Sequence, residues 1–260
     1  MSEAPMHLQR EGNLAVLTIR NPPLNLFDRS MFDAFRAAAA DLESDPPRGL
    51  LIRAEGDVVS AGVDVHEFHG LTAEQGAELW RDLLSAIKAI ERLPCPTVFA
   101  AHALTLTAAF ELSLACDIIV AGRGARFGLV ETVVGLTPSM GGPQRLAERA
   151  GSSRARELVM TAELFDAETL ERWNVVNRVW DDADVDRKAR ELAQRLADGP
   201  TRAHDATKRI VREWCDNGLD SADAIVPEVS GALFETDDLR AAVEAFLEKG
   251  PRHNTPATGR

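Results

Sequence analysis

Polar and apolar positions alternate in two short runs near the amino terminus, which predicts two strands. His7 to Arg10 and Leu14 to Ile19 flank Glu11-Gly12-Asn13, and a glycine-containing turn between two such runs is typical of a β-hairpin. Pro22 and Pro23 follow, and proline cannot donate a hydrogen bond to a sheet ladder. The second strand is therefore expected to end before them.

The pattern then changes to helical spacing. Asp28 can cap a helix whose apolar residues recur at helical spacing, and Asp45-Pro46-Pro47 stops it. Gly49 to Arg53 is a short, continuous apolar run of the kind found in strands buried on both faces. Strand, helix and strand in this order indicate a βαβ unit and an α/β fold.

A longer amphipathic helix is predicted next. Thr72 and Gln75 have the spacing of a capping box at its start. Pro94 and Pro96 end it and lead into an apolar strand, Thr97 to Ala101. The face expected to be buried consists of Trp80, Leu83, Leu84, Ile87 and Ile90.

The central segment places one charged side chain in an apolar setting. The helix predicted over Ala108 to Ala115 has Glu111 as its one charged residue, and Asp117 to Val120 is predicted to form another strand. Burying an ionised carboxylate costs several kcal/mol unless it is paired, so the pKa of Glu111 should rise and the side chain should hold a proton. Such an environment produces a general acid or base.

The pattern after Pro143 is mostly helical. Leu158 to Met160 and Leu164-Phe165 are expected to pack one helix, and Ala167 to Trp173 a second. A short strand, Val175 to Val179, follows, and Asp184 to Ala197 is predicted to form an amphipathic helix.

Gly199-Pro200 breaks the pattern and is the predicted boundary between residues 1–198 and residues 199–260. The tail, Gly250 to Arg260, contains Pro, Asn, Thr and Gly and is expected to be loose. The helical patterns of the second part are Thr201 to Cys215, Ser221 to Phe234 and Asp237 to Lys249.

Net charge, cysteine content and the lack of long apolar segments argue against several classes of partner and location. The 260 residues have a formal net charge of −12 and no run of Lys or Arg, which argues against nucleic acid and anionic membranes as partners. The three cysteines form no CxxC pair, as expected for reduced thiols in the cytosol. The polar amino terminus lacks the apolar core of a signal peptide, and no apolar stretch is long enough to span a bilayer. We therefore expect a cytoplasmic protein.

Taken singly, the polar motifs have ordinary structural explanations. Ser60 to Asp64 fits a strand-to-helix turn with Asp64 as the cap. His66 and His69 lie beside acidic residues, but the missing further ligands favour a solvated helix face over a metal site, so no metal is expected. Glu131 alone would be interpreted as a surface loop residue.

In their order along the chain, the motifs are similar to those of one family. Ser60 to Asp64 precedes the segment ELxLACDI that begins at Glu111, and an ARFGxxE segment ends at Glu131. Gly135 to Leu146 has the form GLxPxxGGxQRL, and Asn174 to Val179 resembles a G-L-V-N-x-V strand. Over about residues 6 to 250 the chain resembles the enoyl-CoA hydratase/isomerase (crotonase) superfamily.

The resemblance implies a fold and a reaction. The fold would be a crotonase-like spiral of repeated ββα units with the active site, followed by a C-terminal helical trimerisation region. The reaction would be hydration of a trans-2-enoyl-CoA to a 3-hydroxyacyl-CoA. The backbone N–H groups of Val63 and Ala108 would form the oxyanion hole. Glu111 would orient or deprotonate water, and Glu131 would deliver a proton to C2.

The resemblance also implies partners. The chain would form a homotrimer or a dimer of trimers, a hexamer, and would act in fatty acid metabolism. No tightly bound cofactor is expected, because coenzyme A enters as part of the acyl-CoA substrate. Phe246 and Lys249 are candidates for contacts with the ligand of a neighbouring copy; taken alone, they would be interpreted as a core aromatic residue and a solvated lysine at a helix end. The remaining substrate contacts would come from Ala61, Val63, Asp64 and Val65.

One segment departs from the family pattern. Thr107-Ala108-Ala109 stands where the family commonly has three glycines. The N–H groups remain, but the added methyl groups intrude on the thioester, and Ala resists φ values that Gly tolerates. Alternatives therefore stay open: isomerisation, thioester hydrolysis or C–C cleavage on a CoA thioester, or a non-catalytic acyl-CoA-binding homologue. Retention of Glu111 and Glu131 favours hydration.

Overall fold

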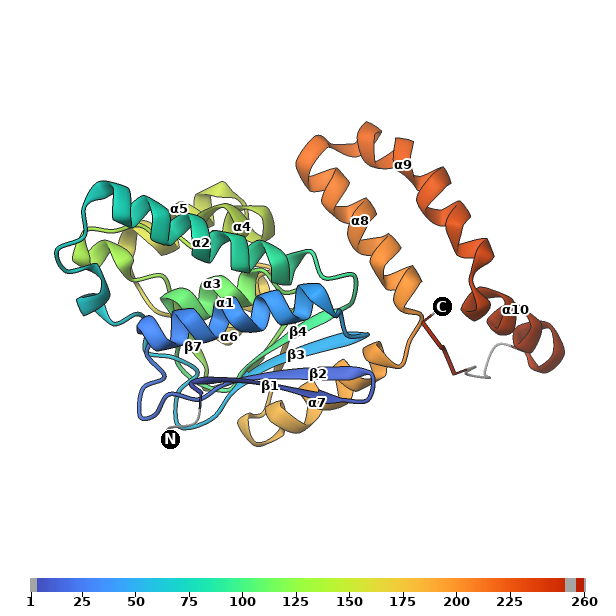
Figure 1. The fold of residues 1–260 in the computed structure, drawn as a ribbon, viewed down its shortest axis with the longest axis horizontal. Coiled ribbons are helices and arrows are strands. Elements are labelled where there is room, and N and C mark those ends of the chain that lie inside the picture. Colours follow the sequence, from blue (N-terminus) through green and yellow to red (C-terminus); the bar gives the residue numbers. More distant parts are fainter. Residues whose placement is uncertain (1–3, 251–255, 260) are drawn as a thin grey trace.

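The computed structural model describes residues 4–250 and 256–259, and its main feature in these ranges is a six-stranded sheet (Figure 1). The strand order is β1-β2-β3-β4-β6-β9. Strands β1 (Met6–Glu11) and β2 (Leu14–Ile19) form the predicted hairpin, and every other neighbouring pair in this sheet is parallel. The remaining strands are β3 (Gly49–Ala54), β4 (Thr97–Ala101), β6 (Ile118–Gly122) and β9 (Arg178–Trp180).

A smaller sheet makes the fold a repeating spiral. It contains β5 (Thr105–Leu106), β7 (Arg126–Gly128) and β8 (Phe165–Asp166). The chain passes from β4 to β5 and then into helix α3 (Thr107–Leu114), and from β6 to β7 and on to helix α4 (Gly142–Ala150). Isolated bridges from Phe27 to Val63 and from Ser60 to Thr105 continue the second layer into earlier turns. This is the predicted succession of ββα units.

Helices cover both faces of the larger sheet (Figure 1). Helices α1 (Arg29–Ser44) and α2 (Ala73–Glu91) lie over one face with α3, and α7 (Val185–Ala197) packs on the other. Along each strand, alternate residues join one core or the other: Leu50 and Ile52 face α1, whereas Leu51 faces α7. The continuous apolar run of β3 is therefore buried on both faces, as predicted.

Local capping explains where the first two long helices begin. Asp28 accepts a hydrogen bond from Met31 N at the start of α1, and Thr72 and Gln75 form the predicted reciprocal capping box of α2. On α2, Leu83, Ile87 and Ile90 are buried, whereas Trp80 and Leu84 are only half-buried.

Two predicted boundaries are wrong. Helix α5 (Ser152–Thr161) ends before Leu164 and Phe165, because Ala162 adopts a left-handed conformation with φ 54° and Phe165 enters β8. The last strand begins at Arg178, because the N–H groups of the two preceding valines, Val175 and Val176, bind Leu170 O. These bonds close the end of α6 (Ala167–Arg172).

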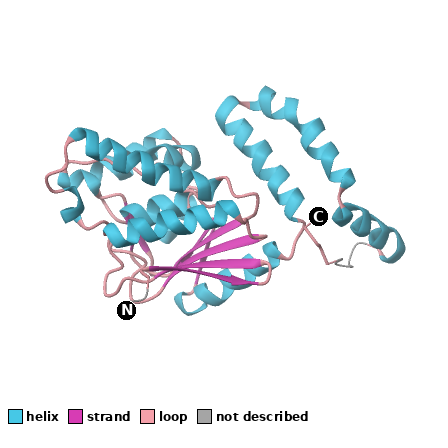
Figure 2. Cartoon of the chain, in the orientation of Figure 1, coloured by secondary structure: helices cyan, strands magenta, loops and turns pink. Residues whose placement is uncertain are grey.

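The C-terminal helices α8 (Thr201–Asn217), α9 (Leu219–Gly231) and α10 (Asp237–Lys249) extend away from the sheets (Figures 1 and 2). Gly199 and Pro200 separate α7 from α8, and the division into residues 1–198 and 199–260 stays a prediction. In the described part of the chain, no helix combines the length and the apolar composition needed to cross a membrane.

Residues 256–259 of the predicted tail form hydrogen bonds with the rest of the chain, and the looseness of the tail stays a prediction. Asp238 accepts hydrogen bonds from Thr258 N at 2.6 Å and from Gly259 N at 2.9 Å, and Arg48 donates to Ala257 O at 2.9 Å. The remainder of the predicted tail, residues 251–255 and 260, lies outside the described residues.

A pair of glycines provides a test of this packing. A Cβ at Gly49 would lie 2.7 Å from Ala197 Cβ, so we expect Gly49→Ala to lower the free energy of unfolding by about 1–3 kcal/mol. Gly76 lies in α2 with open space around it, and Gly76→Ala should raise that free energy by about 0.5–1 kcal/mol. Urea denaturation measures both changes. Equal stability of the two variants would contradict the close approach of β3 to α7.

Candidate active site

Two segments far apart in sequence run side by side and bring the predicted oxyanion residues together. Ser60 pairs in parallel with Thr105, and Leu106 N donates to Ser60 O at 3.1 Å. Two residues further along, a Cβ built on Gly62 would lie 3.0 Å from Thr107 Oγ1. The register therefore places Val63, which follows Gly62, beside Ala108, which follows Thr107.

The N–H of Val63 has no acceptor among the described residues. Phe27 N donates to Gly62 O at 2.9 Å, and Asp64 N donates to Phe27 O at 3.1 Å. In this parallel bridge, the N–H of the residue between them points away from Phe27. Gly62 itself has φ 114°, a conformation that favours glycine, and this explains the small residue before Val63.

The N–H of Ala108 belongs to the first turn of α3. No side chain caps this helix, and an N–H in the first helical turn has no intrahelical acceptor. Partial positive charge also accumulates at a helix N-terminus. Two adjacent amides without hydrogen-bond partners among the described residues are the arrangement that can bind a developing negative charge on oxygen.

Glu111 lies three residues further along α3 and is 2% exposed. Its Oε1 accepts hydrogen bonds from Met140 N at 2.9 Å and Gly142 N at 2.8 Å. Burial, with the negative charge of Glu131, raises the pKa of Glu111 to about 8, although the two N–H donors act to lower it. The predicted burial and raised pKa are therefore confirmed.

Glu131 begins the short 3-10 helix η2 (Glu131–Val134). Its Oε2 is buried and has no hydrogen-bond partner among the described residues. Burial raises the pKa of Glu131 to about 7. The negative charge of Glu131 also raises the pKa of Glu111, so the two carboxyl groups interact electrostatically.

The glycine-rich loop after η2 holds Glu111 in place, a role that the sequence reasoning missed. Gly141 has φ 100°, and a Cβ on Gly142 would lie 3.0 Å from Glu111 Oε1. Arg145, in the first turns of α4, forms a partly buried ion pair with Glu91 at 2.7 Å. The sequence feature that could have indicated this role of the loop is the Gly141-Gly142 pair followed by an arginine.

A positive φ occurs at one of the three residues that stand in place of the family's glycines. Among the residues Thr107-Ala108-Ala109, it is Thr107 that has a positive φ, 47°, and neither alanine adopts such a conformation. The reason is the crossing chain: Gly62 packs against Thr107, and α3 starts there.

Other predicted contact residues have mixed positions. Ala61 N donates to Leu24 O, and Asp64 caps the 3-10 helix η1 (Val65–Phe68), in which Val65 is 52% exposed. Helix α10, which carries Phe246 and Lys249, lies far from α3 in Figure 1, and both side chains are exposed. A single chain therefore does not bring these two residues to the carboxyl pair.

The histidines that follow Asp64 form local contacts. The His66 ring lies 2.6 Å from Asp64 Oδ1. Across residues 4–250 and 256–259, no group of three or more His, Cys, Asp or Glu side chains is placed to hold a metal ion.

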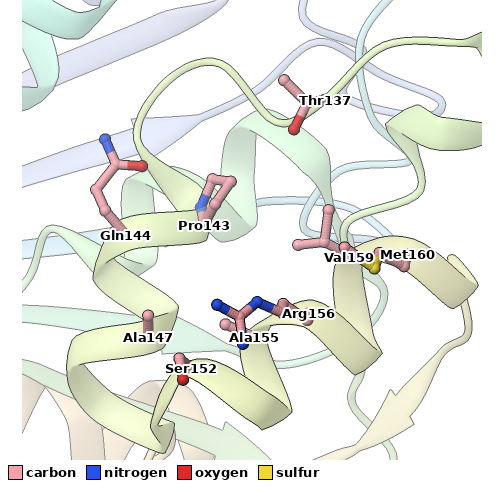
Figure 3. Close-up of a pocket in the computed structure, with 9 residues that line it drawn as sticks. All are labelled: Thr137, Pro143, Gln144, Ala147, Ser152, Ala155, Arg156, Val159 and Met160. Atoms are coloured by element: carbon pink, nitrogen blue, oxygen red, sulfur yellow. The ribbon is translucent and has the colours of Figure 1, made fainter.

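A groove of about 400 Å³ lies between α4 and α5, next to the loop that binds Glu111 (Figure 3). The Arg156 side chain extends into it, and Val159 and Met160 close one end. Neither carboxyl residue lines the groove, so it is distinct from the carboxyl pair. The other lining residues are Thr137, Pro143, Gln144, Ala147, Ser152 and Ala155.

Comparison with known proteins identifies the family. The family model described as enoyl-CoA hydratase/isomerase matches residues 9–255. The chain belongs to this family. A short-chain-enoyl-CoA hydratase of Clostridium acetobutylicum is 28% identical over 93% of this chain and 94% of its own length. A crotonyl-CoA hydratase of Syntrophomonas wolfei is 29% identical with the same coverage.

The solved structures agree in fold. An enoyl-CoA hydratase of Mycobacterium smegmatis superimposes with a TM-score of 0.88 at 26% identity, covering 95% of this chain and 97% of its own. The enoyl-CoA hydratase/isomerase family therefore accounts for the spiral of ββα units as well as for the motifs.

Proposed function

We propose that the chain is an enoyl-CoA hydratase, which adds water to a trans-2-enoyl-CoA and gives a 3-hydroxyacyl-CoA. The observation that carries this proposal is the carboxyl pair: Glu111 is held by two main-chain N–H groups, and Glu131, whose charge acts on Glu111, has an Oε2 without a partner among the described residues. The two relatives that bear hydratase names support the same reaction.

The oxyanion hole activates the substrate. The N–H groups of Val63 and Ala108 bind the thioester carbonyl oxygen and stabilise the negative charge that develops on it as an enolate forms. Removal of one such donor typically costs about 3–4 kcal/mol of transition-state stabilisation. The side-by-side course of residues 60–63 and 105–108 supports this role.

Each carboxyl group of the pair carries out one of the two proton transfers. In the singly protonated pair, the higher pKa of Glu111, about 8 against about 7, favours the proton on Glu111, so the reactive form is the minor one with the proton on Glu131. In that form, ionised Glu111 accepts a proton from water as the water oxygen bonds to C3, and protonated Glu131 gives its proton to C2. Both main-chain donors bind Oε1 of Glu111, which leaves Oε2 for the water. The pair begins the reaction with its proton on Glu131 and ends it with a proton on Glu111. A proton must then return to Glu131 before the next turnover.

The pKa values predict the pH dependence. A pair with one shared proton predominates between the two apparent pKa values, about 7 and about 8, so kcat/KM should be bell-shaped with its maximum in this interval. Below it both carboxyl groups are protonated, and above it neither is. The loss of enoyl absorbance of crotonyl-CoA, followed across pH, measures the profile. A flat profile through the neutral range would contradict the assignment.

Product mass tests the proposed reaction against the alternatives. With crotonyl-CoA and with longer or aryl enoyl-CoAs, hydration increases the product mass by one water, whereas isomerisation leaves it unchanged. Thioester hydrolysis releases free coenzyme A. Tight acyl-CoA binding without turnover of any of these substrates would contradict the hydratase proposal and favour a non-catalytic acyl-CoA-binding homologue.

We also propose a trimer, or a dimer of trimers, with the C-terminal helices at the interface. These helices expose large apolar side chains, which supports contact with another copy. Phe246 and Lys249 would then reach the coenzyme A of a neighbour. Light scattering in solution tests this, and a monomer would contradict it. The exposed residues on α8, α9 and α10 are Val211, Trp214, Leu219, Val243, Phe246 and Leu247.

The proposal includes a cytoplasmic location and substrates from fatty acid metabolism. It requires no tightly bound cofactor, because coenzyme A arrives as part of the acyl-CoA.

A further inference from the structure

Thr107 carries a buried hydroxyl group without a partner. The residue is 6% exposed, and its Oγ1 has no hydrogen-bond partner among the described residues. The large majority of buried side-chain polar atoms are hydrogen-bonded, because an unmade bond leaves the full cost of removing the group from water. An orphan hydroxyl in a native site therefore needs an explanation.

The backbone of the same residue is strained. Thr107 has φ 47°, and a β-branched residue in this region is an outlier, since its side chain crowds the adjacent peptide groups. Such strain persists where the surrounding structure fixes it, and it concentrates at functional sites. Thr107 thus combines two unfavourable features.

The position of the hydroxyl suggests what it binds. A Cβ on Gly62 would lie 3.0 Å from Thr107 Oγ1, so the hydroxyl lies against Gly62. Gly62 precedes Val63, and Thr107 precedes Ala108. The hydroxyl therefore lies against the residue that precedes one proposed oxyanion donor, and it belongs to the residue that precedes the other. A threonine O–H rotates freely and can direct its proton to a nearby oxygen.

We propose that the Thr107 hydroxyl is a third hydrogen-bond donor to the thioester oxygen, beside the N–H groups of Val63 and Ala108. The inference rests on the proposed hydratase function and deepens it. A hydrogen bond to an oxygen that gains negative charge becomes stronger as the charge develops. The hydroxyl therefore acts mainly in the transition state, and its loss should appear in kcat rather than in KM.

Two variants of Thr107 distinguish the effect of its hydroxyl group from the effect of its side-chain shape. Thr107→Val keeps the β-branched shape and removes the donor, and should lower kcat by about 100-fold, the lower end of the effect of losing an oxyanion donor. Thr107→Ser keeps the donor and should recover most of that loss. The thermal midpoint of Thr107→Val should be no lower than that of the wild type, because no hydrogen bond of the free protein is removed. A purely structural role predicts a lower midpoint instead.

Acetoacetyl-CoA is not hydrated, and its enolate carries negative charge that is shared with the thioester oxygen, so this ligand makes the inference testable apart from hydration. Calorimetry should show weaker binding to Thr107→Val than to the wild type, with binding recovered in Thr107→Ser. That result without turnover of any enoyl-CoA by the wild type would support the third donor and reject the hydratase function. Wild-type kcat and wild-type acetoacetyl-CoA affinity in Thr107→Val would overturn the third donor. A faster Thr107→Val would also overturn it, since the hydroxyl would then obstruct the oxyanion hole.

Discussion

Glu111→Gln is expected to lower kcat by about 10²–10⁴-fold and to leave the fold intact, the range typical of a lost general acid–base group. The glutamine Oε1 can still accept the N–H groups of Met140 and Gly142, which hold this side chain at 2.9 and 2.8 Å. It cannot take a proton from water. Steady-state kinetics on the substrate with the highest wild-type rate measures the change. A variant within a few-fold of the wild type would remove Glu111 from the mechanism.

The same variant should change the pH dependence of stability. The pKa of Glu111 is about 8 in the folded protein, against an ordinary value of 4.5, so the unfolded chain releases this proton at lower pH than the folded chain. Glu111 therefore destabilises the folded protein increasingly as pH rises from about 4.5 to about 8. Glu111→Gln has no carboxyl group to ionise, so it is free of this destabilisation. The thermal midpoint of the variant should therefore exceed that of the wild type by more near pH 8 than near pH 4.5. An equal difference at both ends would indicate that the carboxyl is not buried.

The fold could be predicted where local signals agree with the final packing. The turn between β1 and β2, the Asp28 cap and the Thr72–Gln75 capping box are set by neighbouring residues, and the structure confirms each of them. The end of α5 and the start of β9 were misplaced because contacts outside the local pattern decide them. Hydrogen bonds to Leu170 O hold Val175 and Val176 out of the strand, although their apolar side chains fit one.

The site could be predicted only in part, for a related reason. The burial of Glu111 follows from its apolar helix. Its hydrogen-bond partners, however, are main-chain N–H groups 29 and 31 residues away, and residue type does not reveal which main-chain N–H groups will act as donors. The positive φ of Thr107 occurs where Gly62 packs against it, and this contact joins residues far apart in the sequence, so the sequence did not show which of the three residues would adopt such a conformation.

Glu131→Gln should lower kcat by about 10²–10⁴-fold, because Glu131 is the group proposed to protonate C2. Removing its charge should also lower the pKa of Glu111, which that charge helps to raise to about 8. The double variant Glu111→Gln/Glu131→Gln should then be little slower than the worse single variant, since residues that act as a unit are not additive. Steady-state kinetics of the three variants measures this coupling. Multiplicative losses would mean that the two carboxyl groups act in separate steps, and an unchanged rate in Glu131→Gln would assign the C2 proton to another donor.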